Sequence, residues 1–397
     1  MTHTTLALDG LRVVECGGMV SAPYAAKLMA DLGASVTKVE PPEGDPARQR
    51  GPFPPGPEGD PEASGLFLYL NANKRGITLD LRQENDRAAL LALLDQADVF
   101  IHNLDIATAM AAGLDYATLR ERLPALICTW ITPFGLSGPR TGWQAENLTI
   151  VAAGGWASVS PGNSPHAELP PLAPFGHQAD FQAAAHAAVA TMGALFARRR
   201  TGRGQLVEIS AQECIAAALE LALVTYTYTG RVASRLGIRT SAPMEIMRCK
   251  DGLIFVMTAD PHQWDAFVRL MGDPEWATWE IFADRFKRGE NRDVLAPLIE
   301  EWLLQHTVQE VFDLAAEARL PFAPVSQIGD IVASPHLKAR GFFVTVRHPV
   351  AGELTMPGAP YILSGTPYAL RSPAPLLGEH GEEVLADLTP RPPSLAR

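Results

Sequence analysis

The sequence predicts an α/β fold with a parallel, Rossmann-like sheet and a second, smaller α+β domain. Over the first 140 residues, segments of strand composition alternate with segments of helical periodicity, which is typical of β–α–β units. A later block, at about residues 230–330, combines a hairpin pattern with several amphipathic helices. Two different patterns along one chain therefore predict two domains.

Composition and charge indicate a globular protein. The chain has 397 residues, of which 47% are hydrophobic and 19% charged, and this length suffices for more than one core. The formal net charge of −11 argues against a general affinity for nucleic acid or for acidic membranes. A small anion could still bind to a local basic patch.

The cysteines indicate neither a metal site nor a disulfide framework. Cys16, Cys128, Cys214 and Cys249 lie far apart and form no CxxC pair. We expect no metal and a reducing, cytoplasmic setting. The first residues lack a signal-peptide pattern, and no apolar run reaches the ~18 residues of a membrane span.

The N-terminal part begins with a β–α–β unit. Residues 11–16 and 35–40 have strand patterns, and residues 24–32 between them have a helical one. The turn at 17–23 lacks the G-x-G-x-x-G motif, which disfavours a simple NAD or FAD enzyme. Further strands are expected at 77–81, 98–103 and 126–132, with helices at 83–96, 115–122 and 145–157.

Polar residues gather where these strands meet their loops. Asn71, Asn73, Lys74 and Arg75 place donors and positive charge just before the strand expected at 77–81. This pattern fits a cradle for phosphates, and the alternative is a polar loop with solvated cations. Because ligands of such sheets bind beyond the carboxyl ends of the strands, we expect one rim to be shared by Ser21, Asn71, Asn103 and Thr132.

A single carboxylate, Asp180, stands between a loop rich in Pro and Gly and an apolar run at 181–197. Apolar residues in that run recur at steps of three and four, which predicts a helix. Asp180 therefore lies at or near the N-cap, where the helix dipole stabilises negative charge. An ordinary capping role is the alternative to a functional one.

The remaining elements complete the two domains. A strand at 206–210 and a long helix at 212–228 follow the Asp180 helix. The second block contains a hairpin at 247–256 with an Asp-Gly turn, and Thr307 with Glu310 forms the pattern of a capping box. We expect its helices at 260–271, 292–305 and 307–319, and paired strands at 341–363.

Several segments together resemble the family III CoA-transferases, the group of formyl-CoA transferase and carnitine CoA-transferase. They are 8–15 (LDGLRVVE), 30–40 (ADLGASVTKVE), 71–75 (NANKR), 133–139 (PFGLSGP), Asp180, 200–205 (RTGRGQ) and 321–325 (PFAPV). The resemblance implies an interlocked homodimer. It also implies a large Rossmann-like, CoA-binding domain built from both chain ends, 1–229 and 331–397, and a small α+β domain at 230–330.

The resemblance assigns the catalytic role to Asp180. The carboxylate would attack an acyl-CoA thioester, pass through a mixed anhydride and then an aspartyl-CoA thioester, and return to its free form. CoA esters would be substrates, with no tightly bound cofactor. The acyl donor and the acceptor acid stay open, and succinyl-CoA is a reasonable donor to test first.

The resemblance also implies the CoA contacts. They are Val20, Ser21, Ala22, Leu70, Asn71, Asn73, Lys74, Arg75, Asn103 and Phe134. Pro41 and Ala111 stand near positions where other members have Arg, which leaves the site of the 3′-phosphate open. His177 would orient a substrate carboxylate, or it is an ordinary loop histidine.

Two other functions are compatible with the same fold. The related 2-methylacyl-CoA racemases need a second acid/base and carry a His before an acidic residue, but Ala145 stands at that position here. His177 could substitute for it. The third hypothesis is a non-catalytic acyl-CoA-binding subunit, against which the presence of Asp180 argues.

Overall fold

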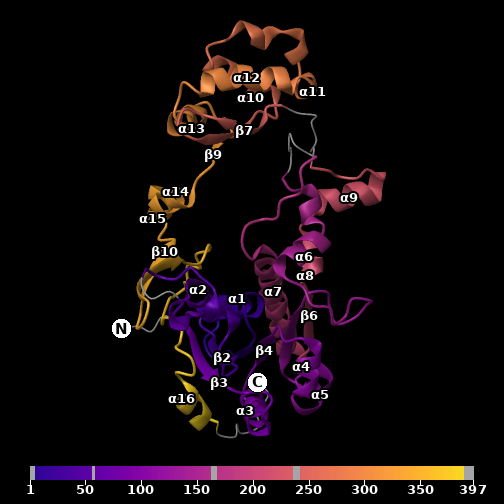
Figure 1. Cartoon of the computed structure of the whole chain (residues 1–397), viewed down its shortest axis with the longest axis vertical. Helices are drawn as coiled ribbons and strands as arrows, with labels where there is room; N and C mark the ends of the chain where they lie inside the picture. The colour runs from indigo at the N-terminus through magenta and orange to yellow at the C-terminus, as the bar shows by residue number, and fades with distance from the viewer. Residues whose placement is uncertain (1–4, 56–58, 162–167, 236–241, 389–397) are drawn as a thin grey trace. The chain divides into compact units, whose positions relative to one another are not determined.

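A computed structural model describes residues 5–55, 59–161, 168–235 and 242–388 (Figure 1). The chain divides into two compact units. The first comprises Met1–Trp156, Ala173–Val224 and Ala339–Arg397, and the second comprises Ala157–Leu172 and Thr225–Lys338. The first unit thus draws on both ends of the chain, and the middle forms the second.

The first unit is organised around a six-stranded parallel sheet, which confirms the predicted α/β class. Its strands are β1 (Arg12–Cys16), β2 (Ser35–Glu40), β3 (Lys74–Thr78), β4 (Val99–His102), β5 (Ile127–Thr132) and β6 (Leu206–Ser210). Their spatial order is β3-β2-β1-β4-β5-β6. This is the order of a doubly wound sheet, whose switch point lies between β1 and β4.

Helices cover both faces of this sheet. The helices of this unit are α1 (Ser21–Asp31), α2 (Gly65–Asn71), α3 (Glu84–Asp95), α4 (Ile106–Ala111), α5 (Tyr116–Arg122), α6 (Asn147–Ala153), α7 (Gln178–Thr201), α8 (Ala211–Ala217) and α16 (Gly381–Ala386), with 3-10 turns at Pro46–Gln49 and Pro61–Ala63. Val14 and Cys16 pack with α3 and α5 in one core cluster. Because strand side chains alternate, Glu15 faces the other side, where α1 and α7 pack together.

Two segments differ from expectation near the predicted phosphate cradle. Helix α2 was not expected from the sequence, and its N-cap Ser64 accepts a hydrogen bond from the backbone N–H of Phe67. Strand β3 begins at Lys74, whereas the sequence pattern placed its start at residue 77. The apolar helix expected at 212–228 is two helices, α8 and α9 (Glu220–Thr229).

The second unit has a three-stranded antiparallel sheet of β7 (Met244–Arg248), β8 (Leu253–Met257) and β9 (Ala323–Pro324). The helical segments of this part of the chain are α10 (Pro261–Leu270), α11 (Arg285–Glu290), α12 (Arg292–Leu303), α13 (Val308–Glu317), α14 (Ile328–Ala333) and α15 (Pro335–Ala339), with 3-10 helices η3 (Trp156–Val159), η4 (Glu275–Thr278) and η5 (Glu280–Phe282). The core includes Trp264, Phe267 and Ile299. Thr307 and Glu310 form the predicted capping box at the start of α13.

The chain returns to the first unit through a hairpin of β10 (Phe343–His348) and β11 (Gly352–Pro357), as the paired-strand pattern predicted. Among the described helices, none is long and apolar enough to cross a membrane.

Candidate active site

A cavity of about 640 Å³ lies at the carboxyl edge of the parallel sheet, within the first unit. Its walls include the residues that follow successive strands: Gly17 after β1, Pro41 after β2, Asn103 after β4 and Pro133 after β5. This is where doubly wound sheets bind their ligands. Backbone and side-chain groups from several loops can therefore converge on one bound molecule.

Five of the predicted site residues line this cavity: Ser21, Asn103, Phe134, His177 and Asp180. Asn103 organises the turn between β1 and α1. Its Oδ1 accepts a hydrogen bond from the backbone N–H of Gly18 at 3.0 Å. Its Nδ2 donates to the carbonyl of Gly18 and to Oγ of Ser21, both at 2.9 Å. The β1–α1 turn and the β4 loop thus form one continuous wall.

Asp180 lies in the first turn of α7, three residues after the N-cap His177. The Nδ1 atom of His177 is 3.4 Å from Oδ2 of Asp180, and the two side chains are 34% and 29% exposed. A carboxylate in this position interacts favourably with the helix dipole. Asp180 is therefore a half-buried carboxylate that still reaches the cavity.

Burial raises the pKa of Asp180 above its usual range. The positive charge that His177 carries when protonated, and its hydrogen bond, lower that pKa, whereas the nearby carboxylate of Glu146 raises it. Glu146 also lines the cavity. Such opposed influences on one accessible carboxylate are typical of functional sites.

The other predicted CoA contacts do not line this cavity. Val20, Ala22, Leu70 and Asn71 have no exposed surface. Asn71 uses its amide within the protein, donating to the carbonyl of Phe67 at 3.0 Å and accepting from Nζ of Lys74 at 2.8 Å. Ser21, Asn103 and Thr132 of the predicted rim thus meet at the cavity, but Asn71 lies in the core.

Lys74 is the first residue of strand β3, and its side chain is buried. Its Nζ donates to Oε2 of Glu15 at 3.1 Å and to the carbonyl of Pro23 at 2.8 Å. Burial lowers the pKa of Lys74 to about 8, against the opposing effect of Glu15. The amine therefore links β1, β3 and the first turn of α1.

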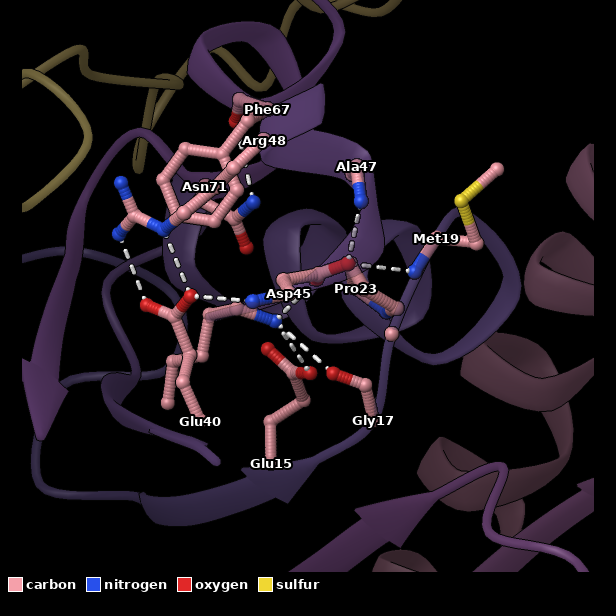
Figure 2. A network of polar contacts seen from close by, with 12 residues as sticks. Glu15, Gly17, Met19, Pro23, Glu40, Asp45, Ala47, Arg48, Phe67 and Asn71 are labelled. Carbon is pink, nitrogen blue, oxygen red and sulfur yellow. Dashed lines mark hydrogen bonds and ion pairs between the residues drawn. The ribbon is translucent and has the colours of Figure 1, made fainter. Parts of the chain in front are cut away.

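Glu15, the partner of Lys74, belongs to a buried ionic network next to the β1–α1 turn, in which Figure 2 labels Glu15, Asp45 and Gly17. Lys38 bridges Glu15 at 3.1 Å and Asp45 at 2.8 Å, and donates to the carbonyl of Gly17 at 3.0 Å. Oδ1 of Asp45 accepts from the backbone N–H of Met19 at 2.8 Å. Gly17 and Met19 line the cavity, so the network holds one wall in place.

Asn73 and Arg75 lie beside a smaller cavity of about 390 Å³, which Lys74 also lines. Nδ2 of Asn73 donates to Asp31 at 2.7 Å, and Oδ1 accepts from the backbone N–H of Arg371 at 2.6 Å. Arg75 forms an exposed ion pair with Glu383 at 3.3 Å. Of the four residues of the predicted phosphate cradle, Asn71 and Lys74 are therefore buried in the core, whereas Asn73 and Arg75 lie at the smaller cavity, which Asp180 does not line.

The cavity residues that were not expected from the sequence include Arg82, Trp143, Glu146 and Asn147. Arg82 is the one Arg or Lys among the described residues that line the cavity, and it is 72% exposed. It follows the Asp80 carboxylate, to which it donates at 2.7 Å. Arg82 directly follows the strand expected at 77–81, so its position at a strand end was a signal in the sequence.

Fold and site define an α/β enzyme with an accessible carboxylate at the carboxyl edge of a doubly wound sheet. The chain belongs to CoA-transferase family III, whose family model matches residues 8–381. This confirms the predicted family. The chain is therefore a CoA-transferase, which moves CoA from an acyl-CoA thioester to a free carboxylic acid.

Individual relatives agree along nearly the whole chain. The chain is 33% identical over 390 residues to the succinyl-CoA:(R)-benzylsuccinate CoA-transferase subunit BbsE of Thauera aromatica, covering 95% of this chain and 93% of the relative. It is 32% identical over 390 residues to succinyl-CoA–D-citramalate CoA-transferase of Chloroflexus aurantiacus, covering 96% and 94%. A crystal structure of a CAIB/BAIF family protein from Brucella suis matches with a TM-score of 0.88 at 30% identity, covering 97% of this chain and 100% of that one.

Proposed function

We propose that this transferase takes CoA from succinyl-CoA and passes it to a second carboxylic acid, with Asp180 as the nucleophile. The observation that carries the proposal is the Asp180 carboxylate on the cavity wall at the start of α7. The names of two relatives from different organisms both specify succinyl-CoA, which supports this donor.

The proposed reaction is a series of four acyl substitutions. An oxygen of Asp180 attacks the thioester carbonyl, a mixed anhydride forms and CoA leaves as thiolate. The thiolate attacks the aspartyl carbonyl, which releases the donor acid and leaves an aspartyl-CoA thioester. The acceptor carboxylate attacks that thioester, and the freed thiolate then attacks the acceptor's carbonyl in the new anhydride. The new acyl-CoA leaves and Asp180 is regenerated.

The surroundings of Asp180 suit this chemistry. The nucleophile must be ionised, and the helix dipole together with a protonated His177 favours the carboxylate. Partial burial removes some of the water that would otherwise hydrolyse an anhydride. His177 also lines the cavity, and its proposed role is to orient the incoming substrate carboxylate.

For CoA, we propose contacts to Ser21, Asn103 and Phe134, and to the backbone of the β1–α1 turn where it lines the cavity. Arg82 is the proposed partner of a CoA phosphate, since it is the basic side chain on an otherwise acidic wall. Arg82 pairs with Asp80 at 2.7 Å and with Glu43 at 3.1 Å, and a phosphate would compete with these two carboxylates. Lys74 stabilises the start of α1 through its hydrogen bond to the carbonyl of Pro23, and Asn71 accepts a hydrogen bond from Lys74.

We also propose that the chain assembles as an interlocked homodimer in the cytoplasm. Apolar side chains on α7 support a partner surface there, since Val189, Met192 and Phe196 are exposed. Light scattering of the purified chain tests the dimer, and a monomer at micromolar concentration would contradict it.

A screen of free acids against succinyl-CoA and acetyl-CoA, read by mass spectrometry of the CoA products, tests the function. We expect CoA to move from succinyl-CoA to at least one acid. The 2-methylacyl-CoA racemase alternative predicts solvent deuterium at the α-carbon without CoA transfer. A non-catalytic subunit would bind acyl-CoA and turn over none of the acids.

A further inference from the structure

The side-chain amide of Asn147 joins the two backbone segments that flank His177. Its Oδ1 accepts a hydrogen bond from the backbone N–H of Ala179 at 2.8 Å, and its Nδ2 donates to the carbonyl of Gly176 at 3.0 Å. The partners define the orientation of the amide, because a backbone N–H only donates and a carbonyl only accepts. Asn147 therefore holds the backbone of Ala179, the residue directly before Asp180.

This contact replaces a cap that α7 lacks. The first N–H groups of a helix need partners from outside the helix. In the described structure, the N-cap residue His177 makes no side-chain capping bond. Asn147, at the start of α6, caps the N–H of Ala179 from a different helix. The helix start that carries Asp180 is thus fixed by a residue more than 30 positions earlier.

The second hydrogen bond holds the bend before the helix. Gly176 has a φ of +78°, a left-handed conformation that favours glycine. Its carbonyl accepts the hydrogen bond from Asn147, so one side-chain amide binds both the backbone at Gly176 and the start of α7. His177 lies between the two anchored residues, and Asp180 follows at once.

We infer that Asn147 is a positioning residue for the transfer reaction: it aims the Asp180 carboxylate into the cavity by holding the backbone on both sides of His177. The inference rests on the proposed role of Asp180. Asn147 also lines the cavity, next to Glu146. Nucleophilic attack needs reacting atoms ~3 Å apart, and a misplacement of ~1 Å can cost ~100-fold in rate.

The test compares Asn147→Ala and Asn147→Asp in the full chain with a matched control, Asn291→Ala. Asn291 lies in the second unit and donates to the carbonyl of Lys287 at 2.9 Å, so its variant also loses an amide-to-backbone hydrogen bond. We measure kcat and KM for succinyl-CoA, the pH–rate profile, Tm and amide hydrogen exchange of the peptide spanning residues 174–182.

Asn147→Ala should lower kcat by roughly 10-fold to 100-fold, because the Asp180 carboxylate is no longer held in the orientation for attack. KM should stay within about twofold, because the proposed CoA contacts are unchanged. Asn147→Asp keeps the acceptor for Ala179 and adds a negative charge near Asp180. It should therefore shift the acid limb of the pH–rate profile to higher pH. Asn147→Ala should exchange faster over 174–182 because the Ala179 N–H loses its acceptor, whereas Asn291→Ala should retain the wild-type kcat, profile and exchange there.

Wild-type kcat and unchanged exchange in Asn147→Ala would overturn the inference. A lower Tm with unchanged kcat per folded enzyme and an unmoved pH profile would also overturn it, since Asn147 would then only stabilise the fold. If the wild-type chain transfers no CoA, the proposed function fails. The exchange measurement still decides whether Asn147 anchors the start of α7.

Discussion

Nδ1 of His177 lies 3.4 Å from Oδ2 of Asp180, across the first turn of α7. The pair brings an imidazole next to a carboxylate whose pKa burial raises. His177 offsets part of that rise. The histidine therefore favours the ionised form of Asp180, and its removal should raise the pKa of that carboxyl group.

We expect His177→Gln to move the acid limb of the pH–rate profile to higher pH. The carboxylate is the active form, so the rate falls as pH falls through the pKa of Asp180. Without the positive charge of His177 that pKa rises further. His186→Gln on the exposed side of the same helix is the control and should leave the profile unchanged. An unmoved limb in His177→Gln would show that the pair does not govern ionisation.

Lys74 allows a direct choice between a structural and a ligand-binding role. Lys74→Met should destabilise the fold by about 3 kcal/mol or more, because it removes one partner from the buried carboxylate of Glu15. Urea unfolding measures this. Arg75→Gln, which breaks an exposed pair with Glu383, should cost less than about 1 kcal/mol. A higher KM for CoA esters in Lys74→Met, with unchanged stability, would instead favour the phosphate cradle.

Arg82→Gln should raise KM for succinyl-CoA several-fold and change kcat little, because the phosphates lie far from the reacting bond. The effect should diminish as salt is added, since salt screens an exposed charge. Arg122→Gln, which removes an exposed Arg paired with Asp95, serves as control and should leave KM unchanged. Equal KM values in wild type and Arg82→Gln would remove Arg82 from the CoA site.

The parallel sheet was predictable because its strands are short segments rich in β-branched residues and bounded by turns, alternating at 35–40 and mostly apolar at 126–132. The capping box of Thr307 and Glu310 was predictable because its chemistry is local. Helix α2 was missed because seven residues are too few for a helical period to appear. Starting β3 three residues late then left Lys74 in a loop, although its amine is buried in the core.

Within the site, Asp180 could be located because a carboxylate at the start of an apolar helix is a local pattern. Its surroundings could not, because they depend on tertiary contacts. Asn147 and Glu146 reach Asp180 only through the packing of α6 against α7. Arg82 comes to the cavity from the end of β3, and its approach follows from the order of the strands in the sheet.

Trapping the proposed covalent intermediate tests the central claim most directly. The chain is incubated with succinyl-CoA, treated with hydroxylamine or borohydride, digested and sequenced by mass spectrometry. We predict one modified residue, Asp180, and no modification in Asp180→Asn, which should fold with wild-type Tm and transfer no CoA. A derivative on another residue, or CoA transfer retained in Asp180→Asn, would contradict the account.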